Sequence, residues 1–362
     1  MSKDYYIIPI FVPHLGCPHD CVFCNQKRIT GKSTDMTKEK ADNIISEHLK
    51  TIPKMDRQLE IAFYGGSFTA ISYDSQRELL DVAYKYKKKG IVNRIRLSTR
   101  PDYIDERELL LLKEYGVDII ELGVQSLDEE VLFHSGRGHG SEAVYSASKL
   151  IKEYGFGLGL QMMIGLPGDN REKSLFTAKE IVKMDPICVR IYPTLVIVDT
   201  YLEKMYLGDK YKPLSLEEAV DISTDLLMIF TYSNIDVIRI GLQPTDNITL
   251  GKDVIAGPFH PAFRQLVESN IYKIILEEYF NQENLYDIDE LIFEVNKKDI
   301  SNLAGQNSNN INYLKEKYKI KKITIYGKDI SNKNLFIKSS DFYDKINKME
   351  FIQKYLISNK LI

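Results

Sequence analysis

The feature that most restricts the fold of this 362-residue chain is a strand, glycine and helix pattern that recurs along its first 250 residues. Short apolar, β-branched runs end in glycine or polar residues, and amphipathic segments follow them. The expected strands cover residues 6–11, 59–64, 94–98, 119–124, 158–163, 189–192 and 237–240, and the expected helices cover about 37–51 or begin at Asp105, Ser141 and Arg171. Six or seven such units predict an α/β fold with a parallel sheet, a partial (β/α)6-type TIM barrel.

Composition and patterning place this barrel in a soluble protein with a smaller second part. The chain is 44% hydrophobic and has no long uncharged apolar run, so we expect no membrane segment. Without a signal peptide or a need for disulfide staples, we expect a reducing, cytoplasmic environment. The expected domains are the barrel at 1–250, a helical connector at 251–284 and a small α/β domain at 285–362.

Three cysteines, Cys17, Cys21 and Cys24, lie within eight residues in a CxxxCxxC spacing. Iron–sulfur clusters normally take four cysteine thiolates, so three ligands would leave one iron of a 4Fe-4S cluster open to a substrate or cofactor. The remaining cysteine, Cys188, is far away in an apolar stretch, where a buried structural role is expected.

Two simpler interpretations of the triplet stay open. One is a zinc site completed by His14 or His19, although structural zinc sites usually pair two CxxC-like elements across a longer loop. The other is a set of three unrelated thiols.

The ends of the expected strands carry most of the unusual polar residues. Gly65 and Gly66 directly follow a strand, where glycine lets backbone amides approach a polar ligand. Other polar groups at strand ends are Ser98–Asp102, Gly123–Ser126, Arg137–His139, Gln161, Gly165–Gly168 and Tyr192–Thr194. In barrels of parallel strands, the chemistry takes place at these carboxyl ends.

A cysteine loop after the first strand and a glycine pair after the second resemble the radical S-adenosylmethionine (radical SAM) superfamily over roughly residues 5–250. Within it, the chain is most similar to the radical domain of the Elongator catalytic subunit. The matching motifs are Tyr64–Phe68, Thr99–Asp102, Glu121–Ser126, Arg137–His139 and Ile191–Ile197. Five motifs in the same order favour a shared fold.

The resemblance implies a radical enzyme that uses a 4Fe-4S cluster and S-adenosyl-L-methionine. Cys17, Cys21 and Cys24 would hold the cluster, with the cofactor's amino and carboxylate groups on the fourth iron. A reduced cluster would cleave the cofactor to a 5′-deoxyadenosyl radical, which abstracts hydrogen from a substrate.

The resemblance also assigns cofactor-binding residues by motif position. Gly66 and Ser67 would lie near the methionine amino group, Arg137 at its carboxylate, Ser98, Gln125 and Gln161 at the ribose and sulfonium, and Phe11 near the adenine. Gly65 is also expected to bind the cofactor. Arg137 has a direct physical reason, because a guanidinium pairs well with a carboxylate.

Two departures limit the comparison with Elongator. The cysteine spacing is the compact form of the superfamily, and nothing past Gly251 resembles an acetyl-coenzyme A loop. We therefore expect no acetyl-coenzyme A domain and do not carry over acetyl transfer. A ferredoxin or flavodoxin is the expected type of electron donor.

The C-terminal part differs in charge from the rest. From Val295 onward, lysines exceed acidic residues by 8, whereas residues 1–294 carry a net charge of −11. The expected order of elements, βααββα, resembles a degenerate KH domain, with Gly305–Ser308 in place of the GxxG loop and a final helix from Asp341. The basic residues that favour RNA are Lys297, Lys298, Lys315, Lys319, Lys321 and Lys322. A cap used for dimerisation or for shielding the barrel is the alternative.

Together these features favour a radical SAM enzyme that modifies an RNA base, with tRNA as the expected partner. Two alternatives stay open. One is radical chemistry on a small molecule such as a porphyrinogen, and the other is a non-catalytic iron–sulfur protein that binds RNA.

Overall fold

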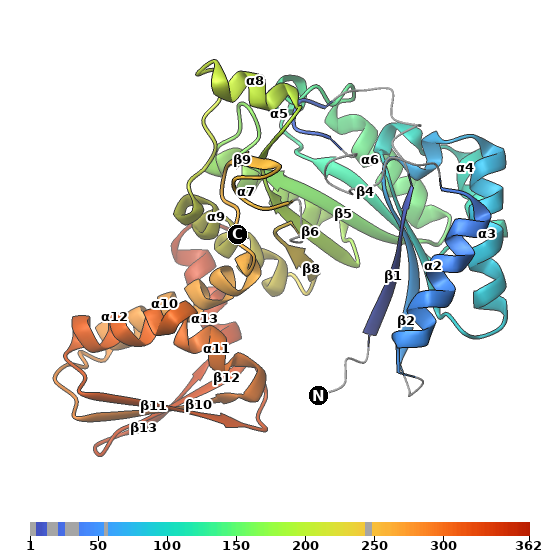
Figure 1. Ribbon diagram of the computed structural model, residues 1–362. Coiled ribbons are helices and arrows are strands. Elements are labelled where there is room, and N and C mark those ends of the chain that lie inside the picture. Colours follow the sequence, from blue (N-terminus) through green and yellow to red (C-terminus); the bar gives the residue numbers. More distant parts are fainter. Residues whose placement is uncertain (1–4, 13–20, 26–35, 54–56, 243–247) are drawn as a thin grey trace. The chain divides into compact units, whose positions relative to one another are not determined.

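A computed structural model describes residues 5–12, 21–25, 36–53, 57–242 and 248–362 (Figure 1). Cys17, His14 and His19 therefore lie outside the described residues. The chain forms two compact units, the first made of residues 1–214, 235–238 and 242–259, and the second of 215–234, 239–241 and 260–362. The three-part division expected from the sequence stays a prediction.

The first unit contains the predicted parallel sheet, curled into a half-barrel. Its strands, in spatial order, are β1 (Tyr5–Val12), β2 (Gln58–Gly65), β3 (Arg94–Thr99), β4 (Ile119–Gln125), β5 (Gly157–Ile164), β6 (Cys188–Pro193) and β8 (Asp236–Ile240). Each strand from β1 to β6 pairs in parallel with the next. The fold class expected from the sequence is confirmed.

Helices between the strands bury one side of this sheet (Figure 1). They are α2 (Lys38–Thr51), α3 (Tyr73–Lys88), α4 (Glu106–Glu114), α5 (Glu129–His134), α6 (Ser141–Glu153) and α7 (Arg171–Met184), with α8 (Tyr201–Leu207) after β6. Polar caps begin several of them; Asp105, for example, accepts the amide of Glu108 at the start of α4. A small β7–β9 ladder (Val196–Ile197 and Val254–Ala256) completes the unit.

The second unit combines helices with a four-stranded sheet. The helices are α9 (Leu216–Tyr232), α10 (Phe263–Gln282), α11 (Ile300–Ala304), α12 (Asn309–Tyr318) and α13 (Lys348–Ser358). The sheet has the order β11 (Lys322–Lys328), β10 (Glu290–Asn296), β12 (Asn334–Lys338), β13 (Tyr343–Asn347). Its core joins Phe280 of α10 to Phe293 of β10 and Ile337 of β12, and all three are fully buried.

One expectation for this unit was wrong. The last helix begins at Lys348, not at Asp341, because Tyr343–Asn347 pairs antiparallel with β12 as a fourth strand. Asn347 then ends the strand and caps α13 by accepting the amide of Met349. The order of elements is βααβββα, and the KH likeness is not confirmed. Among the described residues, no helix is both long and apolar enough to cross a membrane.

Candidate functional site

The glycine pair after β2 lies where the first two strands end side by side. Gly66 donates its amide to the carbonyl of Val12 at 3.1 Å. Gly65 has a φ of +108°, and a Cβ there would lie 2.6 Å from the same carbonyl. Only glycine fits this close approach, so the backbone of the turn itself requires glycine at position 65, whether or not a ligand binds there.

The described part of the cysteine loop, residues 21–25, is held by contacts with two distant segments. The amide of Cys24 closes a turn on the carbonyl of Cys21 at 2.9 Å. Val22 donates to Ser135 at the end of α5 and accepts from Leu202 in α8. These bonds bring Cys21 to the carboxyl end of the sheet.

The sulfur of Cys21 is buried beside two guanidinium groups. Arg137 Nη1 lies 3.3 Å from Cys21 Sγ, and Arg100 Nη1 lies 3.9 Å from it. N–H donors at sulfur stabilise negative charge there, and such hydrogen bonds tune iron–sulfur clusters. Sequence reasoning selected Arg137 but missed Arg100, although the Thr99–Asp102 motif contains it.

Both arginines are fixed in place by further bonds. The carboxylate of Asp102 accepts hydrogen bonds from Arg100 Nε and Nη2, each at 2.9 Å. The carbonyl of Arg137 also accepts a hydrogen bond from Arg100 Nη2. Arg137 Nη2 donates to the carbonyl of Gly123 at the end of β4. The two guanidiniums therefore join the ends of β3 and β4 to the cysteine loop.

His139 accepts a hydrogen bond from Arg137 Nη2 through Nε2 at 3.2 Å. Its Nδ1 faces the carbonyl of Gly140 at 3.1 Å, and because a carbonyl only accepts, Nδ1 carries the proton. Burial, followed by the charge of Arg137, lowers the pKa of His139 to about 4. The imidazole is neutral at physiological pH and orients Arg137.

Several buried polar atoms have no hydrogen-bond partner among the described residues, and two of them belong to predicted cofactor-binding side chains at this end of the sheet. These two are Gln125 Oε1 and Arg137 Nε, one acceptor and one donor. Gln125 is the last residue of β4 and has a φ of +67°. The pairing of β4 with β5 shifts register at this point, so the end of β4 departs from regular strand geometry. Buried polar groups are nearly always paired, so both atoms are suited to bind a polar ligand.

A second polar layer lies deeper within the half-barrel. Glu121 accepts from Arg190 Nε at 2.6 Å and from Arg96 Nη1 at 2.8 Å, and Arg96 also reaches Glu60 at 2.9 Å. All four side chains are less than 10% exposed. Their charges cancel, which makes burial of the group tolerable. Sequence reasoning missed this network, although charged residues at alternate positions of buried strands were a signal.

Ser98 and Gln161 are brought together beside this layer. Gln161 Nε2 donates to Ser98 Oγ at 3.1 Å and to Glu121 Oε2 at 3.0 Å. Cys188 is buried as predicted, and burial raises its pKa to about 11. The predicted roles of Ser98 and Gln161 at the ribose stay predictions.

The remaining predicted cofactor residues have clear local settings. Phe11 lies opposite Tyr64, with ring centroids 6.5 Å apart. Ser67 is buried, and its hydroxyl contacts Thr99 Oγ1 at 2.7 Å and accepts the amide of Arg100 at 3.2 Å. In this structure the Ser67 hydroxyl therefore links β2 to β3.

The donor set fits a thiolate-bound cluster as far as the described residues reach. No group of three metal-ligating side chains occurs among them, since Cys17 lies outside. Cys21 and Cys24 lie in one turn, and two cations face Cys21. Such surroundings suit an anionic centre with sulfur ligands.

Comparisons with known proteins agree with this site. The model of the radical SAM superfamily matches residues 11–181, and that of the radical SAM C-terminal domain matches 186–273. An uncharacterized protein of Methanocaldococcus jannaschii is 30% identical over 236 residues, 62% of this chain and 72% of that protein. A tRNA uridine(34) acetyltransferase of the same organism is 31% identical over 196 residues, 49% of this chain and 36% of the relative.

Among solved structures, archaeal Elp3 of Methanocaldococcus infernus superposes with a TM-score of 0.58 at 23% identity, over 80% of this chain and 66% of that one. At this identity the likeness supports the fold alone. The chain spans about a third of the curated tRNA uridine acetyltransferase.

Proposed function

Because the chain belongs to the radical SAM superfamily, whose members use a 4Fe-4S cluster and S-adenosylmethionine, we propose that it is a radical SAM enzyme that modifies a base of tRNA. Cys17, Cys21 and Cys24 hold the cluster. When bound, the cluster would supply one electron for cleavage of the sulfonium S–C5′ bond of S-adenosylmethionine, which gives methionine and a 5′-deoxyadenosyl radical.

The observation that carries the proposal is the pair of cations at Cys21, beside two buried polar atoms that have no hydrogen-bond partner among the described residues. Arg137 uses Nη1 at the sulfur and keeps Nε for the carboxylate of the cofactor. His139 and Gly123 hold the guanidinium in its orientation. Gln125 Oε1 accepts a hydroxyl of the ribose.

The deeper layer supports the cofactor region without joining the chemistry. Glu121 orients Gln161, which in turn holds Ser98. The charge-balanced network below them holds these amide and hydroxyl groups in position for the ribose and sulfonium. Polar groups that are already oriented need little reorganisation when the cofactor binds.

The tRNA substrate is suggested by relatives whose names specify uridine 34 of tRNA. Since the chain spans only part of those relatives, acetyl transfer is not part of the proposal. RNA is the substrate class proposed.

The radical step is tested by measuring 5′-deoxyadenosine from reconstituted, reduced protein. The wild type and Cys188→Ala should form it, whereas Cys21→Ala should lose about 100-fold or more, because Cys21 is a proposed cluster ligand and Cys188, buried beside Arg96, is not. Absence of product from the wild type, with and without RNA, contradicts the enzymatic proposal.

The substrate is tested by comparing modified nucleosides in tRNA from wild-type and deletion strains. Loss of one modified nucleoside supports the tRNA proposal. An unchanged profile together with active cleavage of S-adenosylmethionine contradicts it and favours a small-molecule substrate.

A further inference from the structure

The four-stranded sheet of the second unit has helices on one face only (Figure 1). The side chains of Leu291, Phe293 and Val295 face those helices and are fully buried. Since side chains alternate along a strand, the intervening residues form the opposite surface, here called the outer face. It consists of Glu290, Ile292, Glu294 and Asn296 on β10, Lys322, Thr324, Tyr326 and Lys328 on β11, Asn334, Phe336 and Lys338 on β12, and Tyr343, Lys345 and Asn347 on β13.

Three aromatic rings lie on the outer face, on three different strands. Glu294 pairs with Tyr326 on one side and with Phe336 on the other, so these residues form one row across the sheet. The ring of Tyr343 lies 5.8 Å from that of Phe336, with planes only 13° apart. Tyr326 is 49% exposed and Tyr343 is 62% exposed. Exposed tyrosines at this density need a reason beyond strand pairing.

Two lysines that have no acidic partner among the described residues lie beside these rings. Lys338 lies opposite Tyr343, and Lys345 lies opposite Phe336. Neither lysine has an ion pair within the part of the chain that the structure describes. Lys328 reaches over the ring of Tyr326 at 6.0 Å. Lys328 also pairs with Glu294 at 3.8 Å, so the positive charge that is available lies beside Phe336 and Tyr343.

Several lysines that the sequence suggested for RNA differ in this respect. Lys297 pairs with Asp329 at 2.6 Å, Lys321 with Asp289 at 2.5 Å, and Lys322 with Glu290 at 2.6 Å. These carboxylates neutralise the charge that a phosphate would otherwise meet. Lys338 and Lys345, which lack such partners among the described residues, lie on the outer face.

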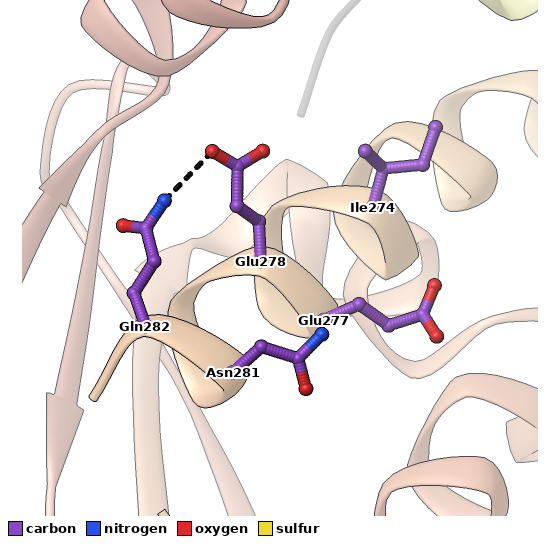
Figure 2. Close-up of a pocket in the computed structure, with 5 residues that line it drawn as sticks. All are labelled: Ile274, Glu277, Glu278, Asn281 and Gln282. Carbon is purple, nitrogen blue, oxygen red and sulfur yellow. Dashed lines mark hydrogen bonds between the residues drawn. The ribbon is translucent and has the colours of Figure 1, made fainter. Parts of the chain in front are cut away.

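The loop that resembled GxxG is also explained by internal packing. A Cβ on Gly305 would lie 2.9 Å from the amide of Asn310, so the helix junction itself requires glycine. The side chain of Gln306 contacts His260 at 3.1 Å. On the helical side of the unit, α10 presents a surface hollow lined by Glu277 and Glu278 (Figure 2). Glu277 pairs with Lys317 at 2.7 Å, and the carboxylate of Glu278 opposes phosphate.

We propose that the outer face binds single-stranded RNA, with bases stacked on Tyr326, Phe336 and Tyr343 and phosphates paired with Lys338 and Lys345. The proposal rests on the proposed function and gives it a substrate-binding surface. Unpaired bases stack on aromatic side chains presented by a sheet, and lysines bind the backbone. Phe336 and Tyr343 lie next to Lys345 and Lys338, which have no ion pair among the described residues, and neighbouring rings and cations of this kind suit a chain of bases and phosphates.

A tryptophan reporter tests the contact directly, because the chain contains no tryptophan. Tyr343→Trp places the only indole on the outer face, and Tyr286→Trp is the control, in an exposed loop after α10. Titration with a 12-nucleotide single-stranded RNA of mixed sequence should quench the fluorescence of the Tyr343→Trp variant and leave that of the Tyr286→Trp variant unchanged. Equal responses of the two reporters would overturn the proposal.

Affinity is measured by fluorescence anisotropy of the same RNA, labelled with fluorescein. Tyr343→Thr keeps a strand-forming residue and should weaken binding about tenfold, in line with ~1–3 kcal/mol per stacked base. Lys338→Gln combined with Lys345→Gln should reduce the salt slope by about 1.4. Tyr286→Thr and Lys354→Gln, two exposed positions off the sheet, are the matched controls and should bind normally.

The outcomes separate this proposal from the proposed function. All variants should retain cleavage of S-adenosylmethionine without RNA. If the wild type and the variants of the outer face bind RNA equally, the outer face is not the RNA-binding surface, and the tRNA proposal stands. If no RNA binds while 5′-deoxyadenosine forms, the face proposal fails and the radical chemistry stands. A concentration-dependent change in the fluorescence of the Tyr343→Trp variant without RNA would assign the face to a second copy and overturn the proposal.

Discussion

Replacing Glu121 by glutamine should reveal how strongly the deep polar layer depends on balanced charge. Glu121 is 1% exposed and accepts hydrogen bonds from Arg96, Arg190 and Gln161. Glutamine keeps the shape but removes the negative charge, which leaves a net positive charge in the half-barrel. Removing one partner of a buried ion pair costs about 3–5 kcal/mol. That is a large share of the ~5–15 kcal/mol by which a domain is stable.

The free energy of unfolding is measured by urea titration with far-ultraviolet circular dichroism, since the chain lacks tryptophan. Glu153→Gln, which removes a carboxylate 54% exposed beside Lys149, should change stability by less than about 0.5 kcal/mol. Combining Glu121→Gln with Arg190→Met leaves Glu60 and Arg96 as a balanced pair. This double variant should therefore be more stable than Glu121→Gln alone. A double variant that loses the sum of the two single effects would refute the reasoning.

Three further outcomes are expected. Burial raises the pKa of Glu121, but the charges of Arg190 and then Arg96 outweigh burial and hold this pKa below its usual range. The ionised carboxylate therefore stabilises the folded state above pH ~4.3, and this stabilisation is lost as the pH falls below that value. Acid titration of the Glu121→Gln variant should lack this loss. Burial and the charge of Arg137 lower the pKa of His139 to about 4, so the folded state should lose stability as pH falls from ~6.5. NMR titration of the ring should show that it is mostly neutral at about pH 6, where a free imidazole is largely protonated. Gly65→Ala, which meets the carbonyl of Val12 at 2.6 Å, should destabilise by more than about 2 kcal/mol, whereas Gly90→Ala, at φ +66° with open space, should cost about 1 kcal/mol by urea titration.

The fold was predictable because each β/α unit carries its own local pattern. The strand from Ile119 and the helix from Ser141 begin where their periodicity and flanking residues place them. The strand at Tyr343–Asn347 was missed because its alternation is mostly polar, and only pairing with β12 makes it a strand. Tertiary pairing, which a single sequence does not display, decided that segment.

The candidate site was predictable where a motif fixes chemistry and less so where packing does. The spacing of the cysteines and the position of Arg137 in a motif were enough to predict them as site residues. Arg100 was missed because its role depends on the fold, which brings residue 100 within 3.9 Å of a sulfur 79 positions earlier. Likewise, Glu60 and Arg96 form a pair only because adjacent strands align them.

The four-stranded sheet of the second unit also has two open edges, β11 and β13. An open edge exposes unpaired backbone groups that can pair with another molecule and start aggregation. Lys322 and Lys328 lie on one edge strand and Lys345 on the other, and charged lysines make such pairing costly. These side chains therefore disfavour edge-to-edge pairing, and variants that neutralise them should be handled at low concentration and checked for fibrous aggregates.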